Sequence, residues 1–390
     1  MRGKWRILKS VHNMFEKKYE FFFFNFILGI NLFYILKNSL LYVENVKIIL
    51  LLANICGILS IYIRKKVNSR MMLIYLGILV ITIFYFGLYR NYSFLTIFVC
   101  LIACEEIDAD KLIKYFLYSG LVLFIPLQIL GVGSSKNTLG LQISILILMY
   151  ISTKKCNLTL LQYICLGIVL ISATVISTSK ALFVITTTAL FLTIIKQTQA
   201  GKKFLRSKFS IYIFPICFFA NFFLAERTVD SNGPLIGTLI PRGINAIIVN
   251  LSKLLDKAMS WRLSLTKQAL NYFGFSMIGG NIDMDSIQLD EHSYFYIDSG
   301  YTYMLLAWGV IFSIMFLVLM TIIMHYFVQI QRYDLIIAGI CIALWGANEP
   351  ILNLVNWNFI ILFGGQAIKY LIIEKRLKAN FKRRSMDANT

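Results

Sequence analysis

Long apolar runs recur along almost the whole of this chain, and they constrain its fold more than any other feature. Runs near or beyond the roughly 18 residues that a helix needs to cross a bilayer follow one another from residue 21 to residue 372. Hydrophobic residues make up 58% of the chain, whereas a soluble domain is about half apolar and gathers that half on one face of each element. We therefore expect an all-α integral membrane protein that forms a single polytopic domain over residues 1–390.

The apolar runs predict about twelve membrane-spanning helices, with spans one to nine in residues 21–226 and spans ten to twelve in residues 299–372. The expected spans are 21–37, 46–63, 71–89, 92–105, 112–132, 138–152, 159–177, 180–196, 209–226, 299–323, 333–347 and 351–372. The fourth and sixth are short for a bilayer, so we expect them to be tilted, broken or partly buried.

The positive residues crowd into alternate connections and predict the orientation of the spans. The basic segments are MRGKWRILKSVHNMFEKK, RKKVNSR, STKK, KQTQAGKKFLRSK and EKRLKANFKRR, whereas LYRNYS, GSSKN, STSK and ANEP are poor in Lys and Arg. Cytoplasmic loops of membrane proteins carry the basic excess. Both termini, 1–20 and 373–390, are therefore expected to be cytoplasmic basic tails. The net charge of +19 then reflects membrane topology, and no nucleic-acid partner is expected.

One connection, residues 227–298, is far longer than the others, and the charge pattern predicts that it lies outside the cell. Long connections are uncommon and tend to be functional. Within it, residues 250–273 predict an amphipathic helix that Ser252 caps and Gly274 ends. Spacings of four and three place one stripe of residues on a single face, namely Leu251, Leu255, Ala258, Arg262, Leu265, Ala269 and Tyr272.

Arg262 is the charged residue at the centre of this apolar stripe. A charge on the buried seam of a helix at a membrane surface requires an anionic partner. One interpretation is that the side chain snorkels to lipid phosphates. The other is that the planar guanidinium clamps the phosphates of a lipid-linked substrate.

The end of the long connection, DEHSYFYIDSGY at 290–301, is rich in polar and aromatic residues. The carboxylates before and within it, Asp283, Asp285, Asp290 and Glu291, do not fit the spacing of a calcium loop, so we expect a solvated acidic turn and no metal site. Among the three histidines, only His292 is expected outside. It is a candidate general base or a donor to an anionic oxygen, with a structural role as the alternative.

The run WRLSLTKQALNYFGFSMIGG, a following histidine and IDSGYTYMLLAWGVI resemble the C-terminal region of the O-antigen ligase and Wzy-type polysaccharide polymerase superfamily. The matching residues are Arg262, Gly279, His292, Asp298, Tyr301 and Gly309. Upstream, SSKNTLG is similar to the outer Lys-Asn motif of that superfamily, with Lys136 and Asn137. STSKALF is similar to its Ser-Arg motif, with Lys180 in place of Arg.

This resemblance implies a metal-independent glycosyltransferase without a cofactor in the cytoplasmic membrane of a bacterium. Such a polymerase joins undecaprenyl-diphosphate-linked oligosaccharide repeat units at the outer face of the membrane. It implies that Arg262, Lys136 and Lys180 stabilise the diphosphate, and that His292 accepts a proton or holds a phosphate. Asn137, Asp298 and Tyr301 would complete the substrate site, with Tyr294, Phe295 and Tyr296 against sugar faces. A flippase and a chain-length regulator of the same pathway are the implied protein partners.

Two alternatives to the polymerase stay open. The first is ligase-like transfer of the glycan to a different acceptor. The second is transport, such as flipping of a lipid-linked oligosaccharide. Transporters usually show internal repeats and ionisable residues near the midplane, whereas the predicted spans are almost free of charge and show no repeat. The kind of surface polysaccharide, whether capsule, exopolysaccharide or O-antigen, does not follow from these residues.

The predicted topology can be tested with cysteines placed at Ser231 and Ser286. Because residues 227–298 are expected outside, an impermeant thiol reagent should label both positions in intact cells. Labelling that requires permeabilised cells would reverse the orientation.

Overall fold

The structure is a computed structural model that describes residues 2–37, 46–64, 69–89, 92–129, 136–177, 180–229, 242–258, 261–280, 282, 297–352 and 354–374. All regular elements in these ranges are helices, which confirms the all-α expectation. The α-helices are α1 Arg2–Lys37, α2 Val46–Arg64, α3 Ser69–Tyr89, α4 Tyr92–Ala103, α5 Ala109–Ile129, α6 Lys136–Thr153, α7 Leu160–Ser177, α8 Lys180–Ile195, α9 Gln199–Leu205, α10 Lys208–Ile211, α11 Ile213–Val229, α12 Arg242–Ala258, α13 Arg262–Phe273, α14 Gly300–Gln329 and α15 Tyr333–Gly346, and the 3₁₀ helix η2 is Phe359–Phe363.

Three of the described helices are long and apolar enough to cross a membrane: Val46–Ile63, Leu160–Ser177 and Gly300–Gln329. Large apolar side chains are exposed on the peripheral helices, including Leu73 on α3 (71%) and Val175 on α7 (73%). Exposed apolar surface on this scale is unusual for a protein surrounded by water. Three helices therefore have the length, and the peripheral helices have the apolar surface, expected of a membrane protein.

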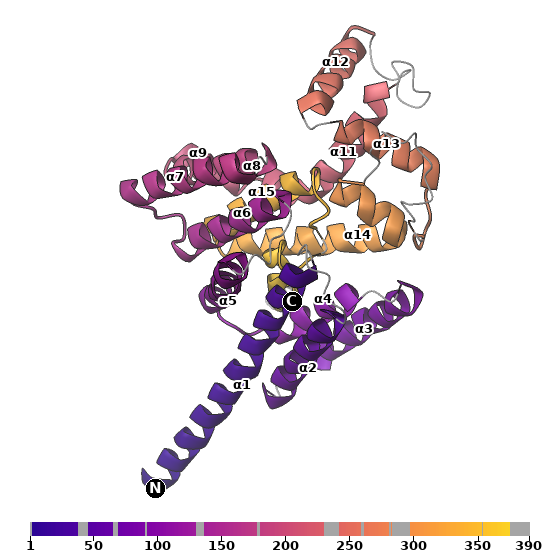
Figure 1. Cartoon of the computed structure of the whole chain (residues 1–390). Coiled ribbons are helices and arrows are strands. Elements are labelled where there is room, and N and C mark those ends of the chain that lie inside the picture. The colour runs from indigo at the N-terminus through magenta and orange to yellow at the C-terminus, as the bar shows by residue number, and fades with distance from the viewer. Residues whose placement is uncertain are drawn as a thin grey trace, which may run out of the picture.

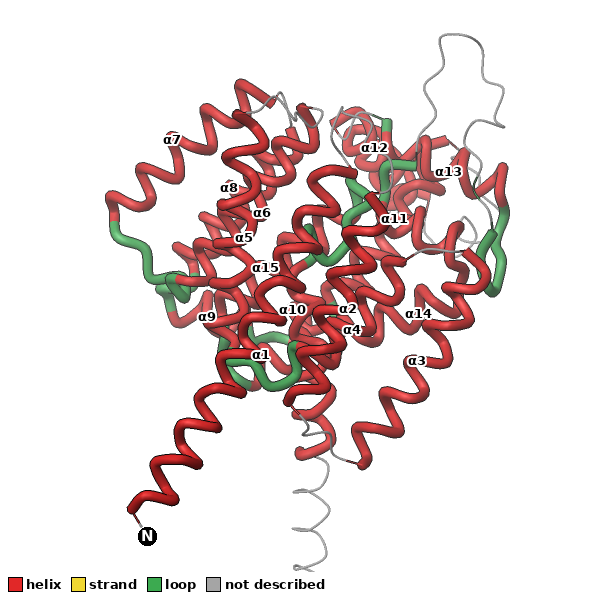
Figure 2. Tube along the Cα trace, turned by 60° about the horizontal axis from the view of Figure 1, so that its bottom comes forward, coloured by secondary structure: helices red, strands yellow, loops and turns green. Residues whose placement is uncertain are grey.

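α14 runs through the centre of the molecule with α15 beside it (Figure 1). α6, α7 and α8 lie on one side of this pair, and α2, α3 and α4 lie on the other (Figure 1). α12 and α13 occupy one edge in both views (Figures 1 and 2). The N-terminal part of α1 extends away from the body, so the expected tail 1–20 continues the first span as one helix from Arg2 to Lys37 (Figure 2).

The prediction of a continuous twelfth span at 351–372 is wrong. Turns fill the described part of 351–358, the 3₁₀ helix η2 follows, and only from residue 364 is the chain α-helical. Ile351, Phe359 and Ile361 are fully buried. Irregular backbone is tolerated in a membrane protein when protein groups surround it and satisfy it. The Asn358 side chain does so here by donating to the Leu352 carbonyl oxygen at 2.6 Å.

α14 is interrupted at Gly309, where the backbone takes φ 83° and ψ 175°. The N–H groups of Val310 and Ile311 donate instead to the carbonyl oxygens of Ser276 and Met277, each at 3.1 Å. The carbonyl oxygen of Leu306, which an unbroken helix would pair with Val310, accepts from the N–H of Gly280 at 3.1 Å. Residues 274–280, here called the docking turn, therefore replace the helical partners that the break removes.

Two glycines make this backbone crossing possible. Gly279 and Gly309 both have positive φ, and a Cβ atom on either would lie under 3.0 Å from backbone atoms of the opposite segment. Only glycine combines this conformation with so close an approach. The two glycines that the resemblance singled out are thus in direct contact, although 30 residues separate them.

Substitution of Gly279 tests the importance of the crossing. We expect Gly279→Ala to lower the free energy of unfolding by at least about 1–3 kcal/mol, because the new Cβ meets both strain and a clash. Its neighbour Gly280 is the matched control, since a Cβ there would meet nothing within 4 Å. Gly280→Ala should stay within about 0.5 kcal/mol of the parent. Equal melting temperatures for both variants in detergent would contradict the prediction.

Candidate functional site

The described part of residues 242–273 contains two helices where the sequence predicted one over 250–273. α12 ends at Ala258, α13 begins at Arg262, and Trp261 between them has a left-handed backbone with φ 66°. The buried Asp256 carboxylate explains the break, because it caps the new helix start. Its Oδ1 accepts from the N–H groups of Leu263 (2.8 Å) and Ser264 (3.1 Å), and its Oδ2 accepts from the Ser264 hydroxyl.

The break also corrects the predicted amphipathic stripe. Leu251 (50%) and Tyr272 (57%) are exposed, whereas Ala269 of the stripe is buried on α13 together with Leu263 and Thr266, which lie outside the stripe. Ser252 lies inside α12 and is not its cap. Gly274 does end α13, as predicted, with φ 68° and its N–H bonded to the Leu270 carbonyl oxygen at 3.0 Å.

Because α13 begins at Arg262, this side chain sits at a helix end and reaches the ends of α14 and α15. Its Nε lies 3.3 Å from Asp298 Oδ2, just before α14, and its Nη1 lies 2.9 Å from Glu349 Oε1, just after α15. Nη1 also donates to the carbonyl oxygen of Asn348. We call Arg262, Asp298, Asn348 and Glu349 the Arg262 cluster. The anionic partners that a buried arginine requires are thus carboxylates of the protein itself.

The two carboxylates of the Arg262 cluster are poorly hydrated. The side chains of Asp298 and Glu349 are 12% and 14% exposed. Burial raises the pKa of Asp298 above its ordinary value, and Arg262 opposes the rise. Burial likewise raises the pKa of Glu349, where Arg262 opposes the rise and the neighbouring Asp298 charge adds to it. One guanidinium facing two carboxylates leaves a site that accepts a proton more readily than ordinary carboxylates do.

The other predicted site residues fall into two groups. Tyr301 is fully buried, and its hydroxyl donates to the Ala343 carbonyl oxygen of α15 at 2.9 Å, so it packs α14 against α15 and does not face the Arg262 cluster. Lys136 and Asn137 are the first residues of α6, and Lys180 is the first of α8. The structure describes their backbone but not their side chains.

His292 lies outside the described residues, together with Tyr294, Phe295 and Tyr296 and the acidic residues Asp283, Asp285, Asp290 and Glu291. Its predicted role as a base or phosphate ligand stays a prediction. Among the residues that are described, no group of three or more His, Cys, Asp or Glu side chains is placed to hold a metal ion.

Glu349 is the site residue that sequence reasoning missed. It lies in ANEP, a connection interpreted only as poor in basic residues. A usable signal existed, because a buried arginine requires a carboxylate on its own side of the membrane. The chain holds only 19 acidic residues, so few candidates lie in the predicted outer connections.

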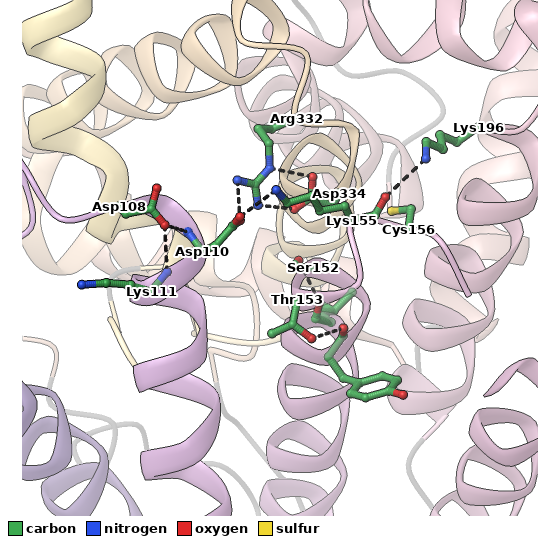
Figure 3. A network of polar contacts seen from close by, with 12 residues as sticks. Asp108, Asp110, Lys111, Ser152, Thr153, Lys155, Cys156, Lys196, Arg332 and Asp334 are labelled. Atoms are coloured by element: carbon green, nitrogen blue, oxygen red, sulfur yellow. Dashed lines mark hydrogen bonds and ion pairs between the residues drawn. The ribbon is translucent and has the colours of Figure 1, made fainter. Parts of the chain in front are cut away.

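A second ionic cluster lies at the opposite end of α15 (Figure 3). Arg332 binds Asp334 in a bidentate pair (3.0 and 2.8 Å), and its Nη1 lies 2.8 Å from Asp110 Oδ1. Asp110 Oδ2 lies 2.6 Å from the Lys155 ammonium. We call these four residues the Arg332 cluster. One of its residues, Lys155, lies in STKK, a basic segment predicted to be cytoplasmic. α15 separates the Arg332 cluster from the Arg262 cluster by roughly 20 Å.

Comparison of the chain with protein families, with curated proteins and with solved structures finds no match in any of the three. The function is therefore inferred from the chain's own geometry together with the resemblance of its short motifs. The geometry offers a fixed cation and two carboxylates that readily take up a proton, at one end of a helical bundle. Such a site suits proton transfer next to an anionic group.

The pH dependence of stability tests the charge balance of the Arg262 cluster. Carboxyl groups with raised pKa values keep protons in the fold that the unfolded chain has lost, so stability falls as pH rises from about 4 through the folded pKa values. Arg262→Ala removes the positive charge that opposes the rise in the two pKa values. The fall in stability with pH should therefore be steeper and extend to higher pH. At neutral pH we expect a loss of about 3 kcal/mol, the lower end for breaking a buried pair.

The check is the melting temperature of the purified protein from about pH 4 to pH 8. The control is the double variant Arg262→Ala with Glu349→Gln, which removes the cation together with one of its two carboxylate partners. It should recover much of the stability that Arg262→Ala loses. Parallel pH profiles for the parent and Arg262→Ala would contradict the prediction.

Proposed function

We propose that this chain is a polysaccharide polymerase that joins undecaprenyl-diphosphate-linked oligosaccharide repeat units by glycosyl transfer. One observation supports this most: motif residues that lie far apart in the sequence converge in space. Arg262 pairs with Asp298 at 3.3 Å across 36 residues. Gly279 of the docking turn lies against Gly309 of α14. Four of the residues that carry the resemblance therefore belong to one structural unit, which supports the proposal.

The chemistry of the transfer suits the Arg262 cluster. The acceptor hydroxyl must lose a proton as it attacks the sugar carbon, and negative charge grows on the diphosphate that leaves. A carboxylate with a raised pKa is a better base near neutral pH than an ordinary one, and Glu349 and Asp298 both qualify. Arg262 Nη2 makes no hydrogen bond to a described residue, so its donors are available to a diphosphate oxygen.

The upstream residues complete the proposal. Lys136 and Lys180 begin α6 and α8, and the positive ends of helices favour anions. We assign them to the diphosphate, with Asn137 beside Lys136. His292 is proposed as a second base or as a phosphate ligand. The protein would work in a bacterial cytoplasmic membrane with both termini inside, alongside a flippase and a chain-length regulator.

Polymer length in cells tests this proposal. If Arg262 acts through its planar fork, Arg262→Lys should fail nearly as badly as Arg262→Ala, since a point charge cannot bridge two partners in the same geometry. Losing a preorganised donor to developing charge costs about 100- to 1000-fold in rate. His292→Ala and Glu349→Gln should each lose about 100-fold or more if the group is a base. Inactive variants should accumulate single lipid-linked repeat units.

Arg332→Lys is the matched control, because Arg332 is also a partly buried arginine paired with two carboxylates but lies in the cluster at the far end of α15. It should keep normal polymer length at normal abundance. Full-length polymer from both Arg262→Lys and His292→Ala would refute the site. Intact polymer with loss of glycan from another acceptor would mark ligase-like transfer instead.

A further inference from the structure

A small cavity of about 30 Å³ lies inside the bundle, away from the Arg262 cluster. It is a partly open hollow lined by α1, α5, α6 and the irregular segment that follows α15. Its polar lining residues are Asn31, Gln142, Asn356 and Trp357, and the rest of its wall is apolar and includes Phe116, Phe124 and Ile145. Four chain segments that are distant in sequence thus meet around one polar hollow.

Four polar atoms of this wall are not satisfied by the described residues, whereas Asn31 Nδ2 donates to the Ser119 hydroxyl oxygen at 2.6 Å. Gln142 Nε2 and Oε1, Asn356 Oδ1 and Trp357 Nε1 are buried and have no hydrogen-bond partner there. Gln142 and Asn356 are each 7% exposed. Buried polar atoms in native proteins are almost always hydrogen-bonded, to protein or to ordered water. Four unpartnered atoms around one cavity therefore indicate that the cavity binds something.

The lining defines the chemistry of the occupant. It offers amide donors, an amide acceptor and an indole donor, and none of the lining residues is charged. An ion would be left unpaired there, so the site does not suit the diphosphate. A water needs about 10–15 Å³ of such a cavity, so 30 Å³ holds about two hydroxyl-sized groups and no sugar ring.

We propose that this cavity is a binding site for neutral hydroxyl groups. In the protein without substrate, two water molecules occupy it and bridge Gln142 of α6 to Asn356 and Trp357. Polar side chains inside a membrane bundle join helices in this way, because hydrocarbon offers them no other partner. The bridge fixes the described part of the irregular segment 351–358. Glu349 lies two residues before the start of this segment.

The depth of the cavity suggests a second source of hydroxyls. Asn31 lies six residues before the end of α1, Gln142 six residues after the start of α6, and Asn356 seven residues after Glu349. Asn31 and Gln142 therefore each lie roughly 9 Å inside the helix ends that the charge pattern predicts outside. Resting on the proposed function, a hydroxyl of the lipid-linked glycan would displace a water there.

Stability without substrate tests the site independently of any activity. Gln142→Met keeps the volume and removes the amide. If the cavity were dry, this variant would lose two unsatisfied groups and melt at a higher temperature. In an occupied cavity it breaks water bridges, so we expect a lower melting temperature. Leu146→Met is the control for repacking the same wall, and Gln366→Met, which loses bonds to Cys104 and Ile107, calibrates the loss of a satisfied amide.

Thiol labelling locates the occupant. Methyl methanethiosulfonate, a small neutral reagent, should modify Gln142→Cys but not Leu148→Cys, which is buried in α6 outside the cavity. Site-resolved mass spectrometry separates these positions from the seven native cysteines. Undecaprenyl-diphosphate-linked N-acetylglucosamine and undecaprenyl diphosphate without sugar are then added in parallel. Protection by the first only assigns the site to carbohydrate hydroxyls, and labelling unaffected by both assigns it to water.

Either of these labelling patterns supports the proposal. A raised melting temperature for Gln142→Met, together with no labelling of Gln142→Cys, would overturn it. Neither measurement requires polymerisation, so the hydroxyl site stands or falls separately from the proposed function.

Discussion

The exchange of backbone hydrogen bonds between α14 and the docking turn is the interaction on which the rest of this end of the molecule depends. Around Gly309, α14 lacks some of its own backbone hydrogen bonds, and residues 276–280 supply the missing donors and acceptors. The docking turn directly follows α13, so α13 is anchored through its C-terminal end to the same helix that Asp298 precedes. Both partners of the Arg262–Asp298 pair are therefore positioned by one helix, and Gly279 and Gly309 set their separation.

Apolar run length predicted where most helices lie because it reports which segments avoid water, and that property is local. The two failures have a common physical cause. The helix expected over 250–273 is broken because the Asp256 carboxylate satisfies the N–H groups of a new helix start. The span expected over 351–372 begins with turns because buried side chains such as Asn358 satisfy its backbone. Such tertiary satisfaction of the backbone leaves no mark in hydrophobic periodicity.

The residues of the Arg262 cluster, like the helices, could be predicted only in part from the sequence. Arg262 and Asp298 could be chosen from short motifs, and the need of a buried arginine for an anion could be argued from charge alone. Glu349 could not be paired with Arg262 from spacing, because the two residues are 87 positions apart and the contact depends on how α15 ends. Tyr301 was assigned to the site from the resemblance alone. Its hydroxyl donates to the Ala343 carbonyl oxygen at 2.9 Å, so its side chain lies in the α14–α15 interface.

The charge of the Arg262 cluster has a consequence for the proposed reaction. With both carboxylates ionised the cluster carries one net negative charge, so a diphosphate that approaches Arg262 also approaches Asp298 and Glu349. A nearby like charge raises the pKa of a carboxyl group further. The carboxylates would thus hold a proton most strongly once the donor lipid is in place. An acceptor hydroxyl would be deprotonated efficiently only in the presence of the diphosphate that is about to leave. The strength of the base would thus depend on the leaving group without any movement of the helices.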